Sequence, residues 1–113
     1  MADITTILND FAYGAKQIFG ATEVEVILFG SYSRGDFEAD SDVDIAIIAD
    51  IPREHERHYT NDLVSLISKI DNEYGYSLLI SPIIISKSFF EEWHETIPFY
   101  RTLKNEGVKI DVA

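Results

Sequence analysis

The chain has 113 residues, no cysteine, and a formal net charge of −11 from 20 Asp and Glu against 9 Lys and Arg. This length fits one domain and is too short for a second substrate-binding domain. The composition excludes a disulfide framework and a zinc–thiolate site, and no segment resembles a signal peptide or a membrane span. Nucleic acid is not the expected main partner, because phosphate binding draws on clustered cations. We expect a cytoplasmic protein with a basic protein partner.

The first half of the chain predicts one helix and two strands. Apolar residues at helical spacing predict a helix over Ile4–Phe19, with Asp3 as its candidate cap and Gly20 as its stop. Two apolar runs, residues 24–29 and 43–48, follow and are typical of strands.

The second half predicts a helix, a third strand and two short helices, over residues 55–71, 76–86, 89–94 and 98–105. The run 76–86 is apolar enough for a fully buried central strand, although Pro82 needs an edge position or a bulge. Ser88 is the candidate cap of the first short helix, and Gly107 ends the last one.

Residues 30–44 contain the most informative pattern in the chain. Gly30 and Ser31 end the first strand, and Asp42 and Asp44 open the second. Side chains two apart on a strand share a face, so the two carboxylates repel unless a cation such as Mg²⁺, carrying substrate phosphates, lies between them. Gly30 permits a tight turn, and Ser31 offers a hydroxyl and an amide to a phosphate. The alternative is a solvated face of an edge strand beside a plain turn.

Arg34 is the candidate cation of this segment. It follows Ser31 by three residues, where a planar guanidinium can hold a triphosphate. The alternative is a surface ion pair with Asp36 or Glu38.

The C-terminal part is rich in aromatic residues: Phe89, Phe90, Trp93, Phe99 and Tyr100. We expect most of them to be core or to cover the sheet, and any exposed part to be a docking surface.

Three motifs together resemble the signature of the DNA polymerase beta-type nucleotidyltransferase superfamily: Leu28-Phe29-Gly30-Ser31, Arg34-Gly35-Asp36 and Ser41-Asp42-Val43-Asp44-Ile45. The short chain and its ending, residues 99–107, are similar to the minimal nucleotidyltransferases of that superfamily. The resemblance covers nearly the whole chain. It implies an α/β fold, a single small polymerase beta-like domain over residues 1–113 with helices packed on a mixed β-sheet.

The resemblance also implies a function. Such a protein transfers a nucleoside monophosphate, here AMP from ATP or another nucleotide, to a hydroxyl of a partner protein. Asp42 and Asp44 would be the catalytic, Mg²⁺-binding residues, and Gly30, Ser31 and Arg34 would bind the nucleotide. The chain resembles the antitoxin half of toxin–antitoxin pairs, whose partner is a small helical HEPN protein, and self-association stays open.

One feature departs from the superfamily pattern. Catalytic members present a third acidic residue on the strand after the helix, but residues 76–86 contain neither Asp nor Glu. A second hypothesis follows from this departure. The chain is then a weakened nucleotide-binding or protein-binding module that neutralises its partner by forming a complex.

Overall fold

The computed structural model describes residues 4–37, 42–75 and 78–110 of the chain. Its helical elements are α1 (Ile4–Phe19), α2 (Ser31–Arg34), the 3₁₀ helix η1 (Arg53–Tyr59), α3 (Thr60–Tyr74), α4 (Lys87–Trp93) and α5 (Pro98–Glu106). Its strands are β1 (Val24–Phe29), β2 (Asp42–Ala49), β3 (Leu79–Ser86) and β4 (Val108–Lys109). None of these helices is long and apolar enough to cross a membrane.

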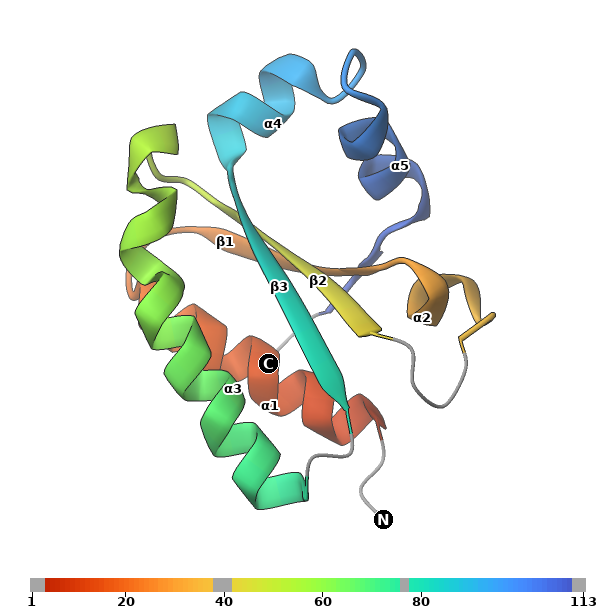
Figure 1. Cartoon of the computed structure of the whole chain (residues 1–113). Helices are drawn as coiled ribbons and strands as arrows, with labels where there is room; N and C mark the ends of the chain where they lie inside the picture. The colour runs from red at the N-terminus through yellow and green to blue at the C-terminus, as the bar shows by residue number, and fades with distance from the viewer. Residues whose placement is uncertain (1–3, 38–41, 76–77, 111–113) are drawn as a thin grey trace.

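The four strands form one mixed sheet in the order β3–β2–β1–β4 (Figure 1). Strand β1 runs antiparallel to both β2 and β4, whereas β2 and β3 run parallel. The parallel pair is joined through η1 and α3, as parallel strands require a crossover connection. The α/β fold with a mixed sheet that the sequence predicts is confirmed.

Helices cover both faces of the sheet, and side chains alternate between them along each strand. One face packs Val43, Ile45 and Ile47 of β2 against α1 and α3, and we call this the first core. The opposite face packs Ala46 and Ile48 of β2 against α4 and α5, and we call this the second core. Because Asp42 and Asp44 have the same parity as Ala46, they belong to the face that carries the second core.

The predicted N-terminal elements agree with the structure. Helix α1 has the bounds that the apolar spacing predicts, and Gly20 follows it with φ +63°. Its proposed cap, Asp3, lies outside the described residues. The predicted helix over residues 55–71 is wrong at its start, because a 3₁₀ helix (η1) precedes α3. The charged residues of η1 offer no apolar stripe that would hold them as an α-helix against the sheet.

The sequence predicts a central, fully buried strand over residues 76–86, of which residues 76–77 lie outside the described part, and this prediction is wrong. Among the described residues β3 is the outer strand of the sheet, with Leu79 60% and Ile83 40% exposed. An edge position accommodates Pro82, which has no N–H to donate to a neighbouring strand. The Ser86 N–H donates to the Glu56 carboxylate at 2.8 Å, so a side chain occupies this end of the edge.

Ser86, and not Ser88, occupies the cap position of α4. Its side chain makes no cap bond. The Ser86 hydroxyl is completely buried and donates to the Ile51 carbonyl at 2.8 Å, tying the end of β3 to the loop after β2.

We expect Ser86→Ala to lower the free energy of unfolding by about 1–2 kcal/mol, because the buried Ile51 carbonyl loses its donor. Ser65→Ala, on the exposed face of α3, is the matched control and should change stability by less than about 0.5 kcal/mol. Urea denaturation of both variants measures the difference. Equal midpoints for the two variants would contradict the structural role of this hydroxyl.

Candidate nucleotide site

Gly30 makes the turn between β1 and α2, and no other residue fits there. Its backbone has φ +76° and ψ −154°, a region that essentially only glycine occupies. A Cβ atom added at Gly30 would also overlap the carboxylate of Asp44. The turn and the second strand therefore meet at this glycine, which brings Ser31 and Asp44 to one place.

A residue that the sequence analysis missed supports the turn. The Ser33 hydroxyl donates to the Gly30 carbonyl at 2.9 Å, and the Ser33 N–H donates to the same oxygen at 3.1 Å. The signal for this role was present, because a serine three residues after a turn glycine commonly bonds back to the backbone.

Asp42 and Asp44 open β2, an interior strand with β1 on one side and β3 on the other. Asp44 lies opposite Phe29 of β1 and beside Ser81 of β3. Asp42 is exposed and Asp44 is half-buried. The interior position rules out an edge strand, which is one part of the alternative interpretation of this segment as a solvated face beside a plain turn.

The electrostatics of the pair suit a divalent cation. Burial raises the pKa of Asp44, the nearby charge of Asp42 raises it further, and the Arg34 guanidinium lowers it. Two carboxylates that share a face and repel each other are a donor set that Mg²⁺ accepts, completing its shell with substrate phosphates and water. The residues present therefore fit one Mg²⁺ ion.

Arg34 ends α2, and its side chain remains exposed. Its Nε donates to Asp36 Oδ2 at 3.2 Å, so the surface ion pair considered from the sequence exists, while Glu38 lies outside the described residues. Such an exposed pair is weak and opens at little cost. Because Arg34 also lowers the pKa of Asp44, its charge acts on the carboxylate pair as well.

The third carboxylate of the superfamily pattern has no counterpart on β3. The residues that lie beside Asp42 and Asp44 on that strand are Leu79 and Ser81. Within residues 4–37, 42–75 and 78–110, no three His, Asp or Glu side chains come together in a group that could hold a metal ion. The described part of the site therefore offers two carboxylates, one fewer than the superfamily pattern.

The raised pKa of Asp44 predicts how stability depends on pH without metal. The folded state binds the proton more tightly than the unfolded chain, so stability falls as pH rises from the ordinary carboxyl pKa of 3.8 through the raised folded value. At neutral pH, Asp44→Asn removes the loss of stability that comes from ionising this carboxyl in the folded state, and it should raise the melting temperature.

Asp50→Asn, an exposed position just beyond β2, removes the same charge and is the control. Thermal melts of the metal-free variants at pH 7 test the prediction. A lower melting temperature for Asp44→Asn than for Asp50→Asn would contradict it.

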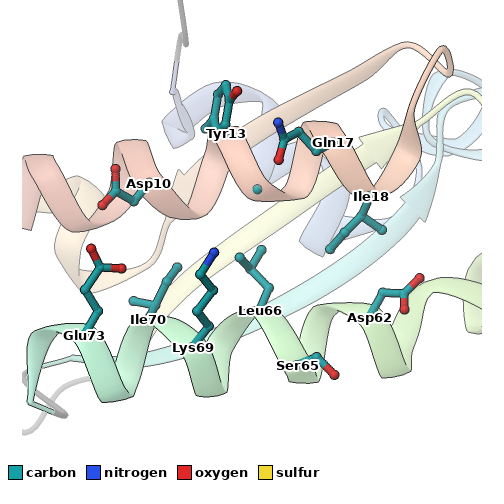
Figure 2. A pocket seen from close by; sticks show the side chains of 11 residues that line it. Asp10, Tyr13, Gln17, Ile18, Asp62, Ser65, Leu66, Lys69, Ile70 and Glu73 are labelled. Atoms are coloured by element: carbon teal, nitrogen blue, oxygen red, sulfur yellow. The ribbon is translucent and has the colours of Figure 1, made fainter.

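A cavity of about 600 Å³ lies elsewhere, between α1 and α3 (Figure 2). Asp10 and Gln17 line it from α1, and Asp62, Lys69 and Glu73 from α3. It lies against the helices that cover the first core, whereas the carboxylate pair belongs to the opposite face. This cavity and the candidate nucleotide site are therefore separate.

Comparisons with known proteins identify the family of the chain. A family model described as a nucleotidyltransferase domain matches residues 8–110. A Methanocaldococcus jannaschii protein named "Putative protein adenylyltransferase MJ0141" is 33% identical over 111 residues, which cover 96% of this chain and 99% of that protein.

Two further proteins of that organism carry the same descriptive name. MJ1305 is 38% identical over 73% of this chain and 54% of its own length, so this chain spans about half of it. MJ0604 is 29% identical over 88% of this chain and 90% of its own length. The enzyme class expected from the sequence is confirmed, and the chain belongs to the nucleotidyltransferase domain family.

Proposed function

We propose that this protein transfers an adenylyl group from ATP, with Mg²⁺, to a hydroxyl of a partner protein. One observation carries the proposal. The glycine-only turn after the end of β1 meets the carboxylate pair at the start of β2. Three relatives named as protein adenylyltransferases support the choice of AMP and of a protein acceptor.

Each residue has a definite part in this proposal. Gly30 has no side chain, so the triphosphate can approach the backbone, and the Ser31 amide and hydroxyl bind its oxygens. Arg34 offsets phosphate charge once its weak pair with Asp36 opens. Asp42 and Asp44 hold Mg²⁺, which when bound offsets the charge on the phosphates and on the departing pyrophosphate.

The reaction itself is a displacement at the α-phosphorus. The acceptor hydroxyl oxygen bonds to phosphorus, the bond to the β-phosphate oxygen breaks, pyrophosphate leaves, and the hydroxyl proton is released. Because the described residues supply two carboxylates here and no third, we assign activation of this hydroxyl to groups outside them, with the partner as the proposed source.

We propose a basic, small helical protein of the HEPN type as this partner. The chain's net charge of −11 favours a cationic surface opposite it and opposes pairing with a second copy. An antitoxin-like role in the cytoplasm would follow from such pairing.

The test is transfer of label from ATP into proteins of a native host lysate. Adenylyl transfer predicts a labelled band with α-labelled ATP and none with γ-labelled ATP, and the band's size identifies the acceptor. Label from γ-labelled ATP alone would instead indicate phosphorylation and contradict the proposal.

The second candidate function is a binding module that keeps the fold without transfer. The specific observation that favours it is the pair Leu79 and Ser81 on β3, where a third carboxylate would stand. It predicts no label from either ATP, together with a partner that co-purifies equally with the native chain and with its Asp42→Asn, Asp44→Asn variant.

A further inference from the structure

An aromatic residue, Phe29, lies beside Asp44 on the same face of the sheet. Phe29 immediately precedes Gly30 and is the Cα partner of Asp44 across β1 and β2. It packs against the second core, which is the face that Asp44 shares. The ring of Phe29 therefore adjoins the place where the proposed function puts the triphosphate.

A second ring, Phe99 at the start of α5, extends this aromatic surface outward. Its centroid lies 5.4 Å from that of Phe29 with the planes at 69°, and 5.9 Å from that of Tyr100. Phe99 is nevertheless 38% exposed, whereas Leu103 on the same helix is fully buried. Its neighbours thus hold the ring in position while part of its surface faces solvent.

Another aromatic pair lies on the face of the sheet opposite to Asp44. Tyr32 and Phe37 stack with centroids 4.1 Å apart and planes at 6°. Tyr32 packs against the first core, on the side of α1 and α3, so this pair does not share the face of Asp44. Phe37 is also exposed, at 48%, which makes it a matched control for Phe99.

We propose that Phe99 is the platform on which the base of the bound nucleotide stacks, with Phe29 holding its ring in place. This inference rests on the proposed function, because it needs the triphosphate at Gly30 and Asp44. A fixed, partly exposed ring suits a flat base, and stacking requires no hydrogen-bond reading of the base. Purines offer the larger stacking area, so ATP and GTP should bind more tightly than CTP.

The test compares a nucleotide with its phosphates alone, by calorimetric titration of the whole chain with Mg²⁺ present. Phe99→Ala should weaken ATP binding by roughly 5- to 150-fold, the range for losing one base–aromatic stack. Binding of inorganic tripolyphosphate, which has no base, should not change. Phe99→Leu keeps an apolar contact with Phe29 and should lose ATP affinity similarly, so the test survives if the alanine variant fails to fold.

The outcomes separate this inference from the function beneath it. A native chain that prefers ATP to CTP, and loses that preference in Phe99→Leu but not in Phe37→Ala, supports the platform. The platform is overturned if Phe99→Leu binds ATP with the same affinity as the Phe37→Ala control. It is also overturned if Phe99→Leu loses as much affinity for tripolyphosphate as for ATP. A native chain that binds neither ATP nor tripolyphosphate overturns the proposed function as well.

Discussion

The Asp42→Asn, Asp44→Asn variant should transfer adenylyl label at least roughly 100-fold more slowly than the native chain, while folding normally. Both carboxylates that can hold Mg²⁺ are removed, and a bound metal supplies several kcal/mol of transition-state charge stabilisation. The substitutions keep side-chain size at an exposed and a half-buried position, so the first core beneath β2 is unaffected. The measurement is the initial rate of labelling by α-labelled ATP.

A melting experiment reports on the same residues without needing the acceptor. Mg²⁺ with ATP should raise the melting temperature of the native chain and leave that of the double variant unchanged, because a ligand stabilises only a state that binds it. Asp50→Asn, Asp62→Asn removes the same two charges at exposed positions away from the pair and should behave like the native chain. A double variant at Asp42 and Asp44 that still labels at the native rate would remove these carboxylates from the mechanism.

The second large effect is expected at Gly30. Gly30→Ala should lower the free energy of unfolding by about 2 kcal/mol, since a side chain is forced into a glycine-only backbone region and against the Asp44 carboxylate. Transfer activity should fall by more than stability alone explains, because the displaced carboxylate is the one proposed to hold Mg²⁺. Denaturant midpoints and labelling rates, measured well below the melting temperature, separate the two effects.

Gly20→Ala is the control for backbone strain. Gly20 also has a positive φ, +63°, but a Cβ there would meet no atom within 4 Å. Gly20→Ala should lower the free energy of unfolding by about 1 kcal/mol and leave the labelling rate unchanged. If Gly30→Ala resembled Gly20→Ala in both measurements, the close approach of Gly30 and Asp44 would have no functional meaning.

The sequence predicted well those elements whose cause is local. The apolar spacing of α1 and the apolar runs of β1 and β2 are properties of short windows, and the structure has these elements where the pattern predicts them. The segment from Gly30 to Asp44 was also informative. A turn at a glycine, and a shared face for two carboxylates two residues apart on a strand, both follow from local backbone geometry.

The sequence predicted poorly those features that depend on which strands are neighbours in the sheet. Strand β3 reads as a central strand because it is apolar, yet it lies at the edge, where η1 and α3 cover part of it. Composition cannot distinguish a central strand from an edge strand, since helices can cover the side chains of both, whereas a neighbouring strand pairs only with the backbone. The same limit hid the Phe29–Phe99 contact, which joins residues 70 positions apart.

The sequence by itself determined the enzyme class, because the motifs around Gly30, Asp42 and Asp44 resemble the nucleotidyltransferase signature. Only the tertiary structure decided that β2 is interior, that Asp44 touches the Gly30 turn, and that Leu79 and Ser81 stand beside the pair. The physical reason is that each side chain's chemistry is a property of that residue alone. The order of the strands, and the face of the sheet on which each side chain lies, instead depend on burying the whole sheet between two helical layers.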